Sequence, residues 1–269
     1  MKLREVISKT SLKAAAREAG LEFRMVGGRV ELTPTDSDDP RYSTDFILPS
    51  MRMVEACRAD DFDFFQPFIE AGRLTAQQMH RAAARYHLGK TRSGKPLFWM
   101  ISQTLDPMDA HIASDDWLSS LLKARQPLLQ HWCPTHCLFG QHLLSTLRSA
   151  PCDASRLKNS TPVAIVESEA SAAVLSELFP EVLWMAYATV EHLDVALFAP
   201  LQGRAVAIYP STDPSASTYL FFLDLAEAVR QRYDIHISVA SILEDLATPP
   251  QKDRCIDLLG FLRESLATD

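Results

Sequence analysis

Between residues 162 and 239 the chain alternates short apolar runs with segments of helical spacing, and this alternation constrains the fold more than any other feature. The apolar runs have the length of buried strands and lie at 162–166, 182–187, 205–209 and 235–239. Helical spacing fills the intervals at 168–178, 190–197 and 214–233, and it continues at 241–246 and 252–265. Short buried strands alternating with helices are typical of a parallel sheet with crossover helices. The C-terminal part is therefore predicted to be an α/β domain with a mostly parallel four-stranded sheet flanked by helices.

The sequence before this domain predicts a smaller α+β region. Residues 1–49 have a helical pattern at 11–19, then two strand-like runs joined by Gly27-Gly28, which is a hairpin signal, and a polar linker at 33–40. Residues 50–160 predict a helix over 75–86 capped by Thr75, a hairpin that turns at 91–94, and helices around 116–129 and 141–147. We therefore predict three units: a helix-hairpin segment (1–49), an α+β region (50–160) and the α/β domain (161–269).

Charge is divided unevenly between these units. Residues 161–269 hold 16 acids and 6 bases, whereas residues 1–160 hold 18 acids and 21 bases. One stretch, 71–100, has no acid and six cations: Arg73, Arg81, Arg85, Lys90, Arg92 and Lys95. These cations are candidates for contacts with nucleic-acid phosphates, and an ordinary solvated face is the alternative. Trp99, together with Phe98, is a candidate stacking surface for an unpaired base.

The sequence also indicates the cellular compartment in which the protein is found. The five cysteines are odd in number and scattered, which is not the pattern of a secreted disulfide framework. No apolar run approaches the ~20 residues that cross a bilayer, and the N-terminus has no apolar stretch of a signal peptide. We expect a cytoplasmic protein with reduced thiols and no membrane partner.

Acidic side chains follow two of the predicted strands. Glu167 and Glu169 come directly after the first strand, Asp213 comes after the third, and Asp257 lies near the C-terminal helix. Ligands of parallel sheets collect beyond the carboxyl ends of the strands, and carboxylates there suit Mg²⁺. Glu167 and Asp213 are therefore candidate catalytic and Mg²⁺-binding residues. Helix capping before Pro214 explains Asp213 equally well, and the helix dipole alone explains Glu169.

Several short motifs follow one another over about 63–262: Tyr86-His-Leu-Gly89, Phe98-Trp99, Cys137-Leu-Phe-Gly140, Val166-Glu-Ser-Glu169, the strand of 206–213 and Cys255-Ile-Asp-Leu258. In their order, these motifs resemble the Toprim-like, primase-related proteins of Bacteroidetes mobile elements, of the mobilisable-transposon type. The resemblance implies a Toprim-like C-terminal domain with an acid that closes the first strand. Toprim enzymes have Asp where this chain has Ser211, and the related proteins have Thr-Gly-Gly where Ala188-Thr-Val190 stands here. The carboxylate set is therefore incomplete, and the resemblance supports the fold better than the activity.

Zinc is not expected at the N-terminus. The related proteins begin with a zinc ribbon, but four Cys or His ligands are needed and the first candidates here are Cys57 and His80. The segment from His131 to Cys137, with His142 nearby, holds several ligand types at a spacing that fits no standard zinc site. Simple packing of Cys137 is the alternative explanation.

These observations lead to three hypotheses about function. In the first, the chain serves mobile-element DNA replication or transfer, binding nucleic acid such as single-stranded DNA and holding Mg²⁺ weakly, without robust catalysis. In the second, the Toprim-like domain has lost catalysis and is a binding or assembly module for a replication or mobilisation protein. In the third, the acidic strand ends serve an Mg²⁺-dependent nuclease or phosphotransferase. The incomplete carboxylate set weighs against an enzyme.

Overall fold

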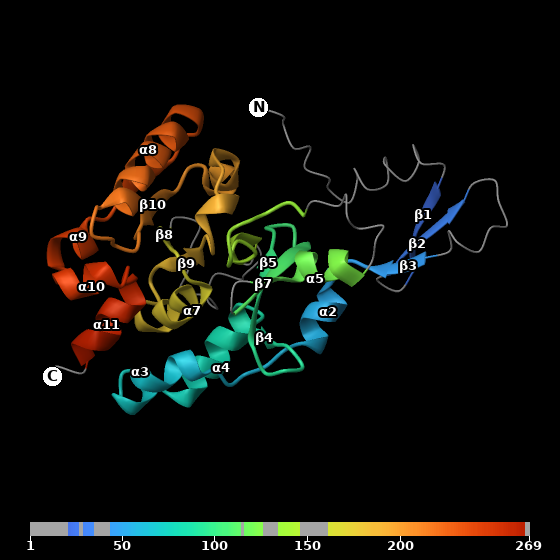
Figure 1. The fold of residues 1–269 in the computed structure, drawn as a ribbon, viewed down its shortest axis with the longest axis horizontal. Coiled ribbons are helices and arrows are strands. Elements are labelled where there is room, and N and C mark those ends of the chain that lie inside the picture. Colours follow the sequence, from blue (N-terminus) through green and yellow to red (C-terminus); the bar gives the residue numbers. More distant parts are fainter. Residues whose placement is uncertain are drawn as a thin grey trace.

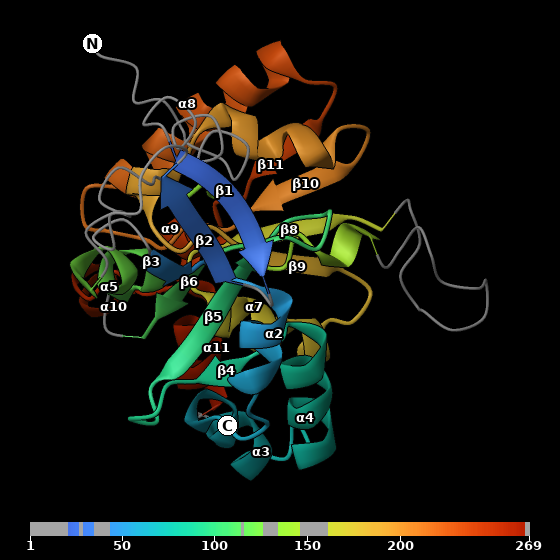
Figure 2. The ribbon, with the colours of Figure 1, turned by 90° about the vertical axis from the view of Figure 1, so that its right-hand side faces the viewer.

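The computed structural model describes residues 21–26, 29–34, 44–113, 116–125, 134–145 and 161–266, and it is a mixed α/β structure. Within these residues the strands form three sheets, one in each of the predicted units. Figures 1 and 2 show the N-terminal sheet at the end of the molecule away from helix α8 (Ser217–Arg232).

The four-stranded C-terminal sheet is parallel throughout, as predicted. Its strands are β8 (Val163–Val166), β9 (Leu183–Ala186), β10 (Ala205–Ile208) and β11 (His236–Val239). They lie in the order β11-β10-β8-β9. The chain therefore places β9 on one side of β8 and then crosses to the other side of β8 to form β10 and β11. Every residue of β8 and β9 is buried, which explains why these runs are apolar without alternation.

The helices predicted around this sheet are present, with two differences. They are α7 (Glu169–Leu178), α8, α9 (Ile242–Leu246), α10 (Pro249–Asp253) and α11 (Leu258–Leu266). The predicted α-helix at 190–197 is instead two 3₁₀ segments, η4 (Val190–His192) and η5 (Val195–Leu201). The predicted helix at 252–265 is divided because Cys255 has a left-handed backbone, φ 49°, which a helix cannot contain.

The middle unit packs helices against an antiparallel sheet. Its helical elements are α2 (Met51–Ala56), η2 (Asp63–Phe65), α3 (Gln66–Glu70), α4 (Ala76–Arg85) and α5 (Leu118–Arg125). Its strands, in spatial order, are β4 (Gly89–Lys90), β5 (Pro96–Ile101), β6 (Pro107–Ile112) and β7 (Asp116–Trp117). Thr75 caps α4 with a reciprocal capping box to Gln78, as its sequence position predicts.

The N-terminal sheet confirms the predicted hairpin. Strands β1 (Leu21–Val26) and β2 (Arg29–Pro34) pair antiparallel across the two residues that separate them, and β3 (Thr44–Ile47) pairs with β2. The predicted helix at 11–19 lies outside the described residues, and so does most of the linker at 33–40.

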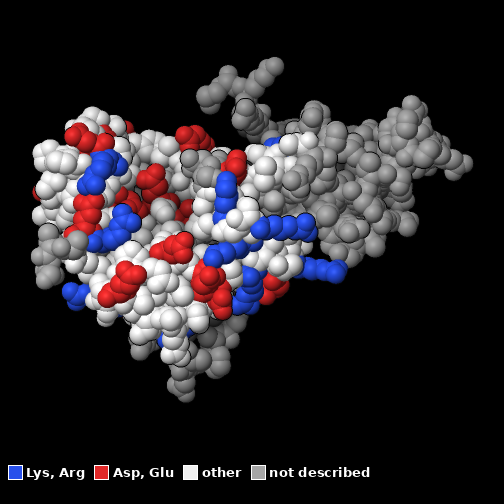
Figure 3. All heavy atoms as spheres, turned by 60° about the horizontal axis from the view of Figure 1, so that its bottom comes forward, with Lys and Arg blue, Asp and Glu red and all other residues white. Residues whose placement is uncertain are grey.

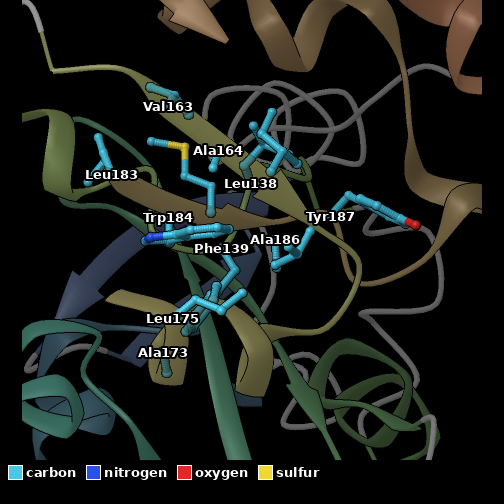
Figure 4. Packing of buried hydrophobic residues seen from close by; sticks show 14 of the residues in the cluster. Leu138, Phe139, Val163, Ala164, Ala173, Leu175, Leu183, Trp184, Ala186 and Tyr187 are labelled. Carbon is cyan, nitrogen blue, oxygen red and sulfur yellow. The ribbon is translucent and has the colours of Figure 1, made fainter. Parts of the chain in front are cut away.

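The middle and C-terminal units share one hydrophobic core, because a segment of the middle unit joins the edge of the parallel sheet. Phe139 and Ala186 of β9 exchange backbone hydrogen bonds of 2.9 and 3.2 Å. Tyr86 stacks on Phe139 and donates its hydroxyl proton to the carbonyl of Trp184 at 2.8 Å. Figure 4 shows Leu138 and Phe139 among the side chains of β8, β9 and α7. Two of the motifs named above, at 86–89 and 137–140, therefore meet in space as packing elements.

Candidate functional site at the carboxyl ends of the parallel strands

An open groove of about 500 Å³ lies at the carboxyl ends of β8 and β9, where a parallel sheet presents its ligands. Three acids that the sequence marks as candidates line it: Glu167, Glu169 and Asp257. Arg254 and Arg263 also line it, so the groove carries charges of both signs. Ala188 lines it with φ 64°, a left-handed conformation that favours glycine.

Glu167 follows β8 and accepts a short hydrogen bond. The Ser211 hydroxyl, beyond the end of neighbouring β10, donates to Oε2 of Glu167 at 2.5 Å. The buried Tyr187 hydroxyl faces the same pair, and in Figure 4 it points away from the apolar cluster. Burial and then the Glu167 carboxylate raise the pKa of Tyr187 above its ordinary value, so this phenol stays protonated. Glu167 is therefore a carboxylate among neutral hydroxyl groups.

The other two acids that the sequence marks are held by structural contacts. Glu169, in the first turn of α7, is 3% exposed and pairs with Nδ1 of His111 on β6 at 2.7 Å. Asp257 accepts from the Ser171 hydroxyl at 2.5 Å and from the Gly260 amide at 2.8 Å, which caps α11. The sequence predicts the dipole role of Glu169, but neither the cap that Asp257 provides nor the His111 partner, which lies on β6, distant in the chain.

Asp213 lies apart from this groove and caps helix α8. Its two carboxylate oxygens accept from the amides of Ser215, Ser217 and Thr218 and from the hydroxyls of Ser215 and Ser217, at 2.5–3.1 Å. Burial acts to raise the pKa of Asp213, but these hydrogen bonds outweigh it and hold the pKa well below its usual range. The alternative explanation of Asp213, as a helix-capping residue, thus accounts for its observed contacts, and Asp213 does not line the groove with Glu167.

With the site described, the chain can be compared with known proteins. A family described as "Domain of unknown function (DUF6371)" matches residues 63–212, more than half of the chain. The chain belongs to this family. The range matched to the DUF6371 family runs from η2 to the loop after β10, so it contains Glu167 and Ser211 and ends before Asp213.

Comparisons with curated proteins and with solved structures do not extend the DUF6371 assignment. No curated protein matches. Among solved structures, "Structure of the DnaG primase catalytic domain bound to ssDNA" is similar, with a TM-score of 0.42, 10% identity and coverage of 81% of each chain. This similarity is too low to establish a shared fold, so the proposals below rest on the chain's own residues. No helix in the described part of the chain is long and apolar enough to cross a membrane.

Two of the six cations predicted to contact phosphate connect helices within this DUF6371 member. Arg81 and Arg85 project from α4 to Glu177 of α7 at 2.6 and 3.0 Å, and the Glu177 side chain is only 2% exposed. The hydrogen bond to Glu177, followed by the charge of Glu177, raises the pKa of Arg81. These two arginines thus neutralise a buried carboxylate, which gives them a structural role whether or not they contact a ligand.

Of the remaining four cations, one is half-buried and three are exposed. Lys90 pairs with Asp61 at 3.0 Å, and Arg73, Arg92 and Lys95 are exposed. On the face drawn in Figure 3, Lys and Arg side chains are interspersed with Asp and Glu. That arrangement agrees better with a mixed, solvated face than with an unbroken basic surface.

The prediction that Trp99 stacks on an unpaired base is wrong. Trp99 lies in β5 with no exposed surface, and neighbouring Phe98 is 5% exposed. A ring buried on both faces by the core cannot receive a base. The sequence could not show this, because an aromatic pair in a strand has the same pattern whether it packs inward or binds a ligand.

The histidine- and cysteine-rich segment does not form a metal centre among the described residues, which contain no group of three or more potential ligands. His131 and Cys133 lie outside those residues. Burial raises the pKa of the Cys137 thiol to about 12, so it stays a protonated, packed group. His142 is buried and its Nε2–H donates to the carbonyl of Arg85 at 3.0 Å.

Proposed function

We propose that this chain is a nucleic-acid-binding protein of mobile-element DNA replication or transfer, with a Toprim-like C-terminal domain that has one working carboxylate at its strand ends. In this proposal Glu167 binds Mg²⁺ weakly, and single-stranded DNA is the favoured nucleic acid. Cytoplasmic location and a replication or mobilisation protein as a further partner belong to the same proposal. The observation that carries it is the contact between Ser211 and Glu167 at 2.5 Å.

That contact supports a metal site with fewer charged ligands than a pair of carboxylates would give. At the end of β10 a second carboxylate beside Glu167 would supply a second charged ligand, whereas the Ser211 hydroxyl supplies a neutral one that is already donating. One carboxylate holds Mg²⁺ only with several waters retained, and phosphoryl transfer by two metals needs more anionic ligands than this. We therefore expect binding rather than turnover.

One observation favours a second candidate, an assembly module without metal. Helix α8 exposes Leu220, Phe221 and Leu223, whose exposed fractions are 56%, 43% and 37%. Adjacent exposed apolar side chains on one helix are a feature of protein-binding surfaces. A replication or mobilisation protein would be the partner in this case, and Glu167 would have no part in the interaction.

The experiment that separates the candidates is a Mn²⁺ titration followed by electron paramagnetic resonance on the parent and two variants. We expect the parent to bind one Mn²⁺ weakly, Glu167→Gln to lose it, and Ser211→Asp to bind at least tenfold more tightly, because a second carboxylate joins the first. Absence of binding by both the parent and Ser211→Asp at millimolar Mn²⁺ would leave the assembly module as the better candidate.

A second measurement tests the nucleic-acid part of the proposal. Binding of a short single-stranded DNA is measured at several salt concentrations, with Arg92→Ala as the variant because Arg92 is exposed in the turn of the β4–β5 hairpin. We expect affinity to fall as the salt concentration rises. In the variant, the slope of log affinity against log salt concentration should be smaller by about one. Affinity that is independent of salt would contradict a phosphate-binding role.

A further inference from the structure

A second pocket, of about 560 Å³, lies on the other side of His111 from the groove, and none of the residues named in the function proposed above lines it. Its walls come from the middle and C-terminal units: Trp117 and Lys123 from β7 and α5, His136 from the segment before Phe139, and His192 from η4. Its volume is within the range of pockets that hold small ligands.

Three aromatic rings from three separate chain segments meet in this pocket. The imidazoles of His136 and His192 are stacked, with ring centroids 3.7 Å apart and planes at 13°. The indole of Trp117 meets both edge-to-face, with centroids 5.5 Å from His136 and 4.8 Å from His192. Such packing fixes the rings relative to one another, so the pocket has a preformed aromatic wall.

The electrostatics keep this wall uncharged at neutral pH. Burial, followed by the neighbouring His192, lowers the pKa of His136 to about 4, and burial also lowers the pKa of His192. Lys123 opposes protonation of His136, whereas at His192 Glu191 favours protonation and His111 opposes it. Neutral imidazoles behave as flat aromatic surfaces, whereas imidazolium rings would attract anions without regard to shape.

We propose that this pocket binds a purine or pyrimidine base, presented by a free nucleotide or by an unpaired position of a single strand. Bases stack on aromatic and imidazole rings in proteins that bind single strands, and every base has a flat face that allows this. Lys123 lines the pocket and is the cation placed to meet a phosphate attached to the base. Glu191 and Asp194 also line it and supply acceptors for exocyclic amino groups.

The pocket also has a physical connection to the groove at the strand ends. His111 packs on Trp117 with ring centroids 5.0 Å apart and pairs with Glu169 at 2.7 Å. The same imidazole thus contacts one wall of each site. The base-binding proposal does not depend on Glu167 or on a metal, so the two proposals can fail separately.

Isothermal calorimetry on the full chain, with EDTA present to exclude metal, tests the pocket. The ligands are AMP, ribose 5-phosphate, which lacks the base, and a short single-stranded DNA with and without one abasic position. The variants are His192→Ala, His192→Phe, which retains a ring, and His236→Ala, a matched exposed histidine on β11.

We expect AMP or the intact strand to bind and ribose 5-phosphate to bind at least tenfold more weakly. His192→Ala should weaken binding roughly tenfold because a stacking surface is lost, while His192→Phe and His236→Ala should retain it. If the strand binds and AMP does not, the single strand is the source of the base. If both bind, either a free nucleotide or a single strand can supply the base. Equal binding of AMP and ribose 5-phosphate, or loss of binding in His192→Phe with a retained unfolding midpoint, would overturn the proposal, as would absence of binding by AMP and strand alike.

Discussion

At the scale of single residues, neighbours decide what a carboxylate does. Glu167 and Asp213 both follow buried strands, and the sequence marks both as metal ligands. Glu167 contacts one hydroxyl of a neighbouring strand end, whereas Asp213 contacts the amides and hydroxyls of its own loop. Asp-Pro predicts that Asp213 caps a helix beginning at Pro214, whereas α8 begins at Ser217 and Asp213 caps it from four positions before its first residue. The Ser211 contact depends on the order of the strands in the sheet, which the residues alone do not determine.

The capping role of Asp213 gives the first prediction. Asp213→Ala removes the acceptor for the first two amides of α8 and for the Ser215 amide before it, and should lower the free energy of unfolding by about 1–2 kcal/mol. Urea denaturation measures this change, and Asp224→Ala, an exposed acid on the same helix, is the matched control. If Asp213→Ala instead abolishes Mn²⁺ binding with stability unchanged, then Asp213 is a metal ligand and not chiefly a cap.

A pH dependence follows from buried His142. Burial lowers its pKa to about 4, although the carbonyl of Arg85 acts in the opposite direction. Between the ordinary value of about 6.5 and about 4 the unfolded chain binds a proton that the folded chain excludes, so stability falls as the pH falls through this range. The loss from His142 is on the order of 3 kcal/mol at pH 4.

Urea unfolding at pH 7 and pH 4.5 measures this loss, and His142→Gln should flatten the dependence because it keeps a donor for the Arg85 carbonyl without titrating. His236→Ala is the control, since that histidine is exposed. An unchanged slope in His142→Gln would assign the acid sensitivity to other groups, of which His136 is the next candidate.

At the scale of elements, apolar patterning predicts the C-terminal unit well and β6 not at all. The strands β8 and β9 are continuous apolar runs, and they are buried throughout, as such runs indicate. Burial alternates along β10 and β11, and β11 also alternates polar with apolar residues. Strand β6 contains Asp109 and His111, which are both buried, so its sequence lacks the apolar pattern that predicts a buried strand. Asp109 accepts from the amides of Ala110 and Ser119, and His111 pairs with Glu169; both partnerships need the folded chain.

The segment that joins the edge of β9 gives a prediction about one glycine. Gly140 has φ 83°, and a Cβ there would lie 3.0 Å from both the Trp184 carbonyl oxygen and the Tyr86 ring. Gly140→Ala should cost about 2–3 kcal/mol, from the left-handed backbone and from displacement of these neighbours. Gly94→Ala is the matched control because Gly94 has φ 84° with nothing within 4 Å, and it should cost only about 1 kcal/mol. Equal unfolding midpoints for the two variants would show that the packing at Gly140 contributes nothing.

At the scale of the whole molecule, the sequence separates units that the fold joins. A boundary near residue 160 is a reasonable inference from composition, yet one hydrophobic cluster extends from Phe62 to Leu258. The link is made by Tyr86, by Phe139 and by the pair of arginines on Glu177. These contacts join residues about 50 to 100 positions apart in the chain, and no local pattern indicates such pairings.

Helix α7 shows what this joining means for stability. Every residue from Ser171 to Glu177 is buried, so α7 is covered on all sides, by β8, β9 and α11 and also by α4 and η2 of the middle unit. A fragment of residues 161–269 therefore exposes the α4-facing side of α7, an unpaired Glu177 and the free edge of β9. We expect this fragment to lack a cooperative thermal transition, whereas the full chain should show one for the middle and C-terminal units together. Circular dichroism and the dispersion of amide resonances compare the two. A fragment that melts cooperatively at the temperature of the full chain would mean that α7 and the parallel sheet fold alone, and that the contacts of Phe139 and Glu177 only dock two finished domains.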